Sequence, residues 1–312
     1  MNTNLHIHVD NYKTNFTIMQ YNVDMSVREE KYENTKWNNR KDRVASLINV
    51  INADIVCLQE MRKLEGTPSI NEFLSSFNRY HYKVEYRNPG SLAFGNAILY
   101  KPDKFYPLQT VKRWLSTTPN TVSDTYINKE GDIPKGFGYI IMGVQFQAVQ
   151  NDKIVVNSAP FWVFNTHLGL EEKLKTESCH QILDIVKEIV SDSNQEFIIC
   201  GDFNFFPDRD GDKQRAILTD KGSLQDLGKG AITINGKPLE GTFVGYEHDD
   251  FKADLKKMVS RLDHVFGSKN VRRISDPILI TKTMKFFEPT EELTDRNLPS
   301  DHLPLLMGLE IN

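Results

Sequence analysis

Residues 196–204 read EFIICGDFN, in which the apolar run Phe197 to Cys200 is followed at once by Asp202 and Asn204. A continuous apolar run of this length is typical of a β-strand that is buried on both faces. Asp and Asn are common turn residues, so either one alone at a strand end would more often be structural. Together they place a carboxylate and a carboxamide at the end of a strand that crosses the core.

Polar side chains stand at one end of several other apolar runs. They are Asn22 after FTIMQY, Glu60 after DIVCLQ, His167 after FWVFNT, Asp263 after SRL, and Asp301 and His302 before LPLL. Further strands are predicted for NAILY at 96–100, YIIMGVQFQ at 139–147 and LPLLMGLEI at 303–311. Turn formation alone does not explain carboxylates, carboxamides and imidazoles at so many strand ends. We therefore predict that these side chains converge in one site.

Helices alternate with these strands. The apolar spacing i, i+3, i+4, i+7 occurs at Val44, Leu47, Ile48 and Ile51, and again at Ile182, Ile185, Val186 and Ile189. A shorter helix is predicted over KQRAIL, residues 213–218. Amphipathic helices between strands indicate sheets with helices packed on the outside.

Two stretches lack a sustained apolar period and are predicted to be long surface loops. Residues 113–138 are rich in turn formers and are a candidate lid or substrate-contact loop. Residues 240–261 are the second, and a plain solvated connection is an equal alternative for them.

The composition is that of a globular protein. The chain has 312 residues, of which 39% are hydrophobic, and a formal net charge of −4. A protein that grips nucleic acid mainly through its phosphates is usually basic, so this charge weakens a nucleic-acid substrate without excluding it. Length and continuity predict one domain over residues 1–312, with no linker or repeat.

Cysteine content and terminal sequences bear on the cellular compartment. Cys57, Cys179 and Cys200 are interpreted as buried, reduced thiols, with a Cys57–Cys200 disulfide as the alternative if their strands adjoin. The start of the chain lacks the pattern of a signal peptide, and no run approaches the length of a membrane span. These features predict a cytoplasmic protein, with non-classical export as the alternative.

The residue types at the strand ends are those that phosphate-ester hydrolysis needs. Such a site must bring positive charge to the phosphate, deprotonate a water and stabilise the leaving oxygen. Glu60 is a candidate ligand for Mg²⁺, which prefers carboxylates and substrate phosphates. Asp202 is the candidate base for the attacking water, and Asn204 is placed to donate to a phosphate oxygen if the backbone stays extended.

The two histidines need partners that hold their tautomers. If Asp263 lies beside His302, it accepts from one ring nitrogen and leaves the other facing the phosphate. His167 is the candidate donor on the opposite flank. Asp301 is a candidate contact of the metal or of a second cation, and Asn22 is expected to position Glu60 or a water beside the metal.

The ordered motifs NVD, LQE, NTHL, GDFN, RLDH and SDH resemble the endonuclease/exonuclease/phosphatase superfamily over residues 16–310. The resemblance implies a four-layer α/β/β/α sandwich, in which two mainly antiparallel sheets are flanked by helices. It also implies Mg²⁺ or Mn²⁺ as cofactor and the site roles given above. Asp24 of the NVD motif is similar to a residue of the abasic-site endonucleases, which implies an additional metal contact.

Differences from individual branches of the superfamily narrow the range of candidate substrates. Phe205 follows Asn204 where the inositol polyphosphate phosphatases carry a basic residue, and the abasic-site endonucleases lack the histidine found here as His167. Secreted sphingomyelinases begin with an export signal, and deadenylases carry more elaborate upstream motifs. WNNRKDRV, WLSTTP and GTFVGY resemble a poorly characterised bacterial and fungal branch, although its arginine motif is replaced by GYIIMG.

The resulting hypothesis is a monomeric Mg²⁺- or Mn²⁺-dependent phosphodiesterase or phosphatase with an Asp-activated water. Its substrate is a phosphate ester, and the ester could belong either to a nucleic acid or to a phospholipid headgroup. The alternatives are a nuclease or deadenylase acting on DNA or RNA, and a non-catalytic binding protein on the same fold. No motif residue is missing, which disfavours the last alternative.

Overall fold

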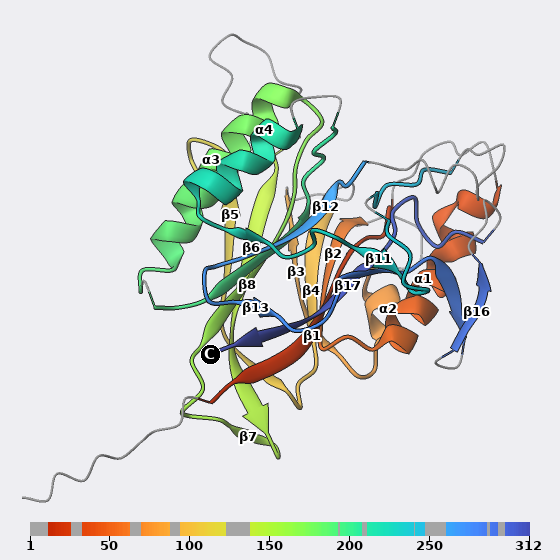
Figure 1. The fold of residues 1–312 in the computed structure, drawn as a ribbon, viewed down its shortest axis with the longest axis horizontal. Coiled ribbons are helices and arrows are strands. Elements are labelled where there is room, and N and C mark those ends of the chain that lie inside the picture. The colour runs from red at the N-terminus through yellow and green to blue at the C-terminus, as the bar shows by residue number, and fades with distance from the viewer. Residues whose placement is uncertain are drawn as a thin grey trace, which may run out of the picture.

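Two β-sheets pack face to face and carry helices on their outer sides, forming four layers (Figure 1). The computed structural model describes residues 12–25, 33–62, 70–87, 94–122, 138–192, 194–207, 211–239, 241–246, 260–285, 288–292 and 297–312. The predicted α/β/β/α sandwich is confirmed.

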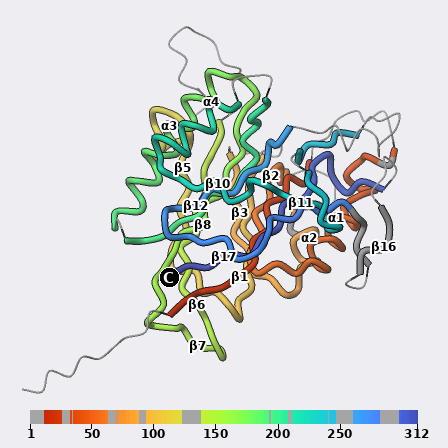
Figure 2. The backbone as a smooth tube through the Cα atoms, viewed as in Figure 1, coloured from red at the N-terminus to blue at the C-terminus, as the bar shows by residue number. Residues whose placement is uncertain are grey.

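The larger sheet has eight strands among the described residues and contains the first and the last of the described strands. Its strands are β1 (Thr14–Asn22), β2 (Ile55–Arg62), β3 (His81–Tyr86), β4 (Phe94–Tyr100), β11 (Ile232–Thr233), β13 (Arg272–Arg273), β14 (Ile278–Leu279) and β17 (Leu305–Ile311). Their order is β11-β14-β17-β1-β2-β4-β3, with β13 beside β17. β1 is antiparallel to β17 and parallel to β2, so the first and last strands lie side by side (Figure 2).

The second sheet has seven strands in the described part of the chain. They are β5 (Phe105–Trp114), β6 (Ile140–Gln150), β7 (Lys153–Ile154), β8 (Phe161–His167), β9 (Phe197–Asp202), β10 (Gln225–Asp226) and β12 (Asp263–Gly267). Their order is β10-β12-β9-β8-β6-β5, with β7 beside β6. β8 and β9 are parallel, and β12 is antiparallel to β9. A separate antiparallel pair is formed by β15 (Lys282–Lys285) and β16 (Glu288–Glu292).

Helices cover the outer face of each sheet. They are α1 (Trp37–Ile51), α2 (Ile70–Ser75), α3 (Glu172–Ile189) and α4 (Gly211–Ala216), with a 3₁₀ turn at Glu33–Thr35 and a π-helical turn at Ile217–Lys221. α1 and α2 pack on the larger sheet, while α3 packs on the second. All three predicted helices are confirmed, and the predicted apolar positions of α1 and α3 face the sheets, with Ile51 and Ile189 partly buried.

The main core lies between the sheets. Phe16 of β1 stacks on Phe161 of β8 with 5.3 Å between ring centroids, and Phe105 and Phe146 join the same cluster. Strands with a sheet on one face and helices on the other are buried on both, which explains the continuous apolar runs. Cys57 and Cys200 lie in this core as free thiols, as the interpretation of buried, reduced cysteines predicted.

The prediction missed two of the longer strands, β3 and β5, and also the short strands β7, β10, β11, β13, β14, β15 and β16. β3 and β5 form the outer edges of the two sheets, and most of their residues are only partly buried or exposed. β5 also contains Pro107 at an irregularity in its pairing with β6, as expected for an edge strand. The loop predicted for 113–138 therefore starts later, because Arg113 and Trp114 belong to β5. Residues 123–137 of that loop, and 247–259 of the predicted loop 240–261, lie outside the described residues.

Within the described residues, no helix combines the length and the apolar character that crossing a membrane requires.

A buried carboxylate ties the start of β2 to β1 and β4. Asp54 Oδ2 accepts a hydrogen bond from the Thr17 amide at 2.9 Å, and Oδ1 lies 2.9 Å from Nζ of both Lys101 and Lys104. Burial by itself raises the pKa of Asp54, but these partners outweigh it and lower that pKa below its ordinary value. A lowered folded-state pKa stabilises the fold above the unfolded pKa, and this stability is lost as the pH falls through the folded value.

We predict that Asp54→Asn lowers the free energy of unfolding at pH 7 by about 2 kcal/mol, the scale of hydrogen bonds to a charged group. The difference from the unmodified protein should shrink as the pH falls below the unfolded-state pKa of about 4, because the stabilisation from the lowered pKa is lost from there downwards. Urea titrations at pH 7 and pH 3 measure both values. Asp103→Asn, an exposed charge in the neighbouring turn, is the matched control. An equal loss at both pH values would contradict the assignment.

Candidate functional site

Strands of both sheets meet at one edge of the sandwich and bring polar side chains together there. Asn22 is the last residue of β1, His167 ends β8 and Asp202 ends β9. His167 pairs with Asp202 in the parallel register of β8 and β9, so their side chains start at the same level. Asp263 pairs with Asp202 from the opposite direction, because β12 begins where β9 ends.

Glu60 reaches the site by a route different from the predicted one. It does not follow β2 but lies within it, at a register shift between Leu58 and Met61. Its φ angle is 56°, a left-handed conformation that costs a residue other than glycine about 1–3 kcal/mol. A bulge of this kind changes the direction of a side chain, and here it turns the Glu60 carboxylate toward Asn22.

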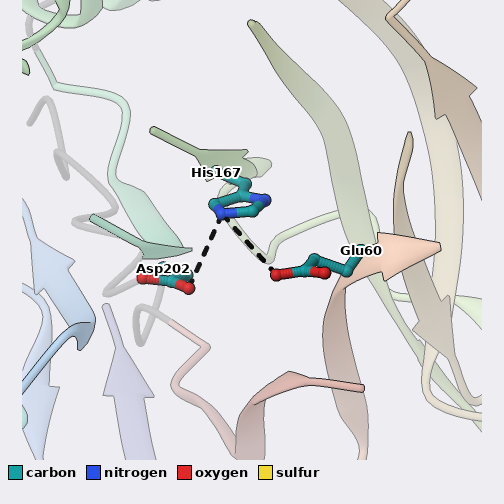
Figure 3. Close-up of side chains that lie close together, drawn as sticks. All are labelled: Glu60, His167 and Asp202. Atoms are coloured by element: carbon teal, nitrogen blue, oxygen red, sulfur yellow. Dashed lines mark ion pairs between the residues drawn. The ribbon is translucent and has the colours of Figure 1, made fainter. Parts of the chain in front are cut away.

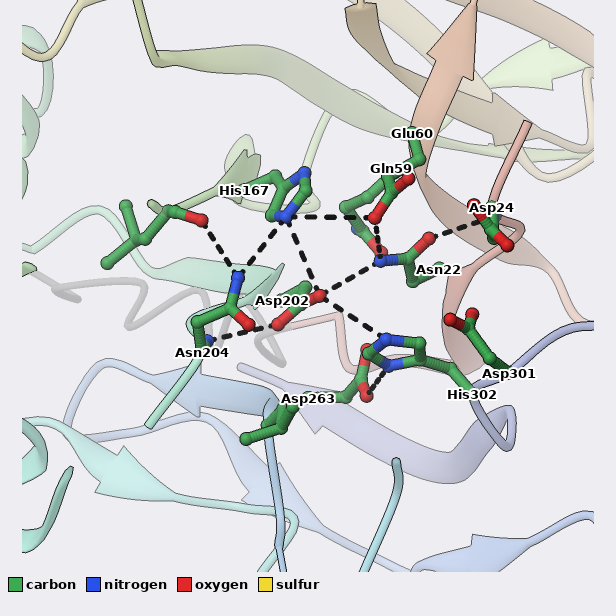
Figure 4. A network of polar contacts seen from close by, with 12 residues as sticks. Asn22, Asp24, Gln59, Glu60, His167, Asp202, Asn204, Asp263, Asp301 and His302 are labelled. Carbon is green, nitrogen blue, oxygen red and sulfur yellow. Dashed lines mark hydrogen bonds and ion pairs between the residues drawn. The ribbon is translucent and has the colours of Figure 1, made fainter. Parts of the chain in front are cut away.

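The carboxamide of Asn22 joins two carboxylates. Its Nδ2 donates to Glu60 Oε1 at 3.0 Å and to Asp202 Oδ2 at 2.9 Å, and its Oδ1 accepts from the Asp24 amide at 3.0 Å (Figure 4). Both Nδ2 hydrogens are thereby used on carboxylate oxygens. Asn22 is fully buried, so it holds the two acids at a set spacing away from bulk water.

The two carboxylates are held where ionisation is costly. Burial, reinforced by the charges of Asp24 and Asp301, raises the pKa of Glu60 to about 8. Burial also raises the pKa of Asp202 to about 7, against the opposing charge of His302. Negative charge is therefore in excess around Glu60.

His302 and Asp263 form an ion pair inside the site. His302 Nδ1 lies 2.7 Å from Asp263 Oδ2, and Gln20 Nε2 donates to Asp263 Oδ1 at 3.2 Å. The charges of Asp263 and Asp202 overcome the effect of burial and raise the pKa of His302 well above its ordinary value. His302 Nε2 points toward Asp202, 3.7 Å from Oδ2. The structure thus brings Asp263 and His302 together as the sequence suggested.

His167 approaches Asp202 from the other side. Its Nε2 lies 3.6 Å from Asp202 Oδ2 and 4.0 Å from Glu60 Oε1 (Figure 3). Its Nδ1 lies 3.0 Å from Nη2 of Arg87, the residue that follows β3. Burial and the Arg87 charge lower the pKa of His167 well below its ordinary value. The two histidines therefore flank one carboxylate but have opposite electrostatic partners.

Asn204 also lies in the site, but the backbone between it and Asp202 is not extended as predicted. Asn204 has a φ of 53°, and its amide donates to Asp202 Oδ1 at 3.0 Å, which closes a local turn. Lys175 of α3 donates to the Asn204 carbonyl at 2.7 Å, and Asn204 Nδ2 donates to the Leu168 carbonyl at 2.9 Å. These contacts hold the Asn204 amide beside His167, with 3.3 Å between Nδ2 and Nε2.

Asp24 and Asp301 lie next to this group with partners of their own. Asp24 Oδ2 accepts from the Tyr246 hydroxyl at 3.1 Å and lies 3.4 Å from Nη2 of the fully buried Arg40. The Asp301 carbonyl accepts from the amides of residues 244 and 245. Both carboxylates affect the ionisation of Glu60, which places their charges close to it.

A hard divalent cation fits the oxygen atoms around Glu60. Among the described residues, two groups hold potential ligand atoms within 4.8 Å of one another: Glu60, His167 and Asp202, and Asp202, Asp263 and His302. Carboxylate oxygens suit Mg²⁺ or Mn²⁺, and a cation beside Glu60 would relieve the excess of negative charge.

Several buried polar residues of the site region were missed in the sequence. Gln59 Nε2 donates to Gln20 Oε1 at 2.9 Å and to Asn165 Oδ1 at 2.6 Å, and all three side chains are fully buried. Each of these side chains interrupts an otherwise apolar strand, and that interruption was the available signal. Arg87 and Arg40 had no comparable signal, because an arginine beside a strand or in a helix is usually solvated.

Comparisons with known proteins agree with this architecture. The sequence pattern of the Endonuclease/Exonuclease/phosphatase family matches residues 19–302. An uncharacterized protein of Acanthamoeba polyphaga mimivirus is 27% identical over 297 residues, covering 94% of this chain and 99% of the relative.

Two solved structures share the fold. An endonuclease/exonuclease/phosphatase family protein from Bacteroides thetaiotaomicron superposes with a TM-score of 0.72 at 20% identity, covering 97% of both chains. A mannosyl-6-phosphatase from the same organism superposes with a TM-score of 0.69 at 21% identity, covering 94% of this chain and 98% of that one. The resemblance inferred from the six motifs is confirmed, and this chain belongs to the endonuclease/exonuclease/phosphatase family, whose members are typically hydrolases of phosphate esters.

Proposed function

We propose that this protein is a Mg²⁺- or Mn²⁺-dependent hydrolase of phosphate esters that uses Asp202 to activate the attacking water. The observation that carries the proposal is the position of Asp202, whose Oδ2 accepts from Asn22 and has one histidine nitrogen on each side, at 3.6 and 3.7 Å. A carboxylate between two imidazoles can take a proton from a water molecule, and that water then attacks a phosphorus atom whose oxygens the imidazoles hold.

Glu60 is the proposed principal metal ligand, with Asp301 beside it, Asp24 as an additional contact and Asn22 positioning the Glu60 carboxylate. When bound, the metal neutralises charge on the phosphate and makes phosphorus more electrophilic. The charges of Asp24 and Asp301, which oppose the ionisation of Glu60, support this assignment.

The other residues act directly on water and phosphate in this proposal. Asp202, with a pKa raised by burial to about 7, is matched to accept a proton from water near neutral pH. His302 is held by Asp263 and donates from Nε2 to one phosphate oxygen. His167 and Asn204 donate from the opposite flank.

Both phosphate monoesters and phosphate diesters are candidate substrates. The mannosyl-6-phosphatase shares the fold at 21% identity, a level that supports the architecture alone. A panel with p-nitrophenyl phosphate, bis-p-nitrophenyl phosphate and single-stranded DNA, each with Mg²⁺ and with Mn²⁺, distinguishes phosphatase, phosphodiesterase and nuclease. Absence of turnover on the whole panel would favour a non-catalytic binding protein.

We predict that Asp202→Asn lowers kcat by at least about 10²- to 10⁴-fold, the usual contribution of a general base. The substitution keeps the shape of the side chain and removes its basicity. Steady-state kinetics on the best substrate of the panel measure the loss. Asp220→Asn, an exposed carboxylate on the π-helical turn, should retain full activity. Full activity of Asp202→Asn would contradict its role as base.

We predict that Glu60→Gln weakens Mn²⁺ binding by at least about 10- to 100-fold, since even indirect partners of a metal have effects of that size. Isothermal titration calorimetry without substrate measures this affinity directly. Glu177→Gln, which removes an exposed carboxylate of α3, is the matched control and should bind as the unmodified protein does. Equal affinities for Glu60→Gln and the control would remove Glu60 from the metal site.

A further inference from the structure

The two histidines of the site differ in what faces Nδ1. At His302, Nδ1 meets the Asp263 carboxylate at 2.7 Å, and a carboxylate oxygen accepts a hydrogen bond. At His167, Nδ1 meets the Arg87 guanidinium at 3.0 Å. A guanidinium has N–H donors and no acceptor, and it keeps its charge at every accessible pH. The lone pair of His167 must therefore be on Nδ1.

A neutral imidazole has one N–H group, so a lone pair on Nδ1 puts the hydrogen of His167 on Nε2. Asn204 Nδ2 is a donor that lies 3.3 Å from that same Nε2. A neutral imidazole has one lone pair on its ring nitrogens, so His167 cannot accept hydrogen bonds from both Arg87 and Asn204. The Asn204 orientation is determined by its hydrogen bond to the Leu168 carbonyl at 2.9 Å. The shorter contact, to a permanent cation, decides the tautomer, and Nε2 then has Asp202 and Glu60 as acceptors.

The guanidinium of Arg87 is held in place by its surroundings. Its carbon Cζ lies 4.2 Å from the centroid of the Tyr139 ring and 5.7 Å from the centroid of the Phe94 ring, so it makes cation–π contacts with both rings. The Trp114 indole donates to the Arg87 carbonyl at 2.7 Å. Arg87 is only 7% exposed, and it contacts Nδ1 of His167, whereas Nε2 faces Asp202.

We propose that Arg87 is a positioning residue that holds His167 in the Nε2-protonated tautomer, so that His167 presents a hydrogen-bond donor to the substrate phosphate. The proposal rests on the proposed function for its catalytic consequence. The two histidines then have different tasks: His302 shares its Nδ1 hydrogen with a carboxylate, whereas His167 keeps its only hydrogen for the phosphate. Arg87 does not touch the phosphate and acts through the imidazole.

The tautomer is measured by two-bond ¹H–¹⁵N correlation NMR of ¹⁵N-histidine-labelled protein at pH 8, where an ordinary imidazole is neutral. His167→Gln identifies the His167 signals among those of the eight histidines. The expected spectrum of the unmodified protein has a protonated Nε2 and an unprotonated Nδ1. A proton on Nδ1 would overturn the proposal whatever the activity, and this measurement requires no folded variant of Arg87.

Arg87→Met should introduce the second tautomer and lower kcat by about 10- to 100-fold, the scale of losing an indirect partner, with a smaller change in KM. Arg87→Lys, which keeps a charged donor, should recover most of the activity and the original spectrum. Arg113→Met, which removes an arginine from the nearby strand β5, is the matched control and should change neither. An unchanged His167 spectrum and unchanged kcat in Arg87→Met would refute the role of Arg87.

These experiments can refute the proposed function and the positioning role of Arg87 independently of each other. If the unmodified protein hydrolyses no phosphate ester but His167 carries its hydrogen on Nε2 and loses that preference in Arg87→Met, the positioning role stands and the hydrolase proposal falls. If hydrolysis occurs and Arg87→Met leaves the tautomer unchanged, the hydrolase proposal stands and the positioning role falls.

Discussion

The hydrogen bonds from Asn22 to Glu60 and Asp202 are the interaction on which the site depends. Asn22 and Glu60 belong to the larger sheet, and Asp202 belongs to the second, so one carboxamide joins the two sheets at their shared edge. A partly buried carboxylate and a buried one within 4.8 Å of each other repel, and a neutral double donor between them offsets that repulsion without adding charge. A cation near Glu60 is consistent with the repulsion that remains from Asp24 and Asp301.

Three buried amides and the Asp263 carboxylate form a hydrogen-bonded group that continues the connection between the sheets. Gln20 and Gln59 come from the larger sheet, while Asn165 and Asp263 come from the second, and hydrogen bonds join all four. Polar groups at this depth are costly unless each finds a partner. These hydrogen bonds can all form only when the two sheets are placed in one way relative to each other. They therefore specify that placement more sharply than the surrounding apolar contacts do.

The site also stores backbone strain that helices and loops hold in place. Asp24, Glu60 and Asn204 all have left-handed φ angles, between 46° and 56°. Arg40 of α1 donates to the carbonyls of Val23 and Asp24, and Lys175 of α3 donates to that of Asn204. α1 and α3 therefore each place one buried cation at the edge where the sheet that they cover carries the site. Strain of this kind persists only where surrounding contacts hold the backbone in place. The hydrogen bonds from the outer helices therefore help to maintain the geometry of the site.

The sequence by itself determined the two long helices, the eight central strands and the residue types of the site. Apolar periodicity and run length are local properties, so α1, α3 and the eight central strands could be predicted, and strand-end residues such as Asp202 and His302 were visible as interruptions. Tertiary structure alone decided how Glu60 is turned by a bulge, how Asn204 is held by a turn, and which group faces each histidine. Arg87 lies 80 residues from His167 and follows a partly exposed edge strand, so nothing local indicates their contact. The tautomer and the pKa of a side chain depend on the charges and hydrogen-bonding groups near it in space, and the order of residues in the chain does not reveal these.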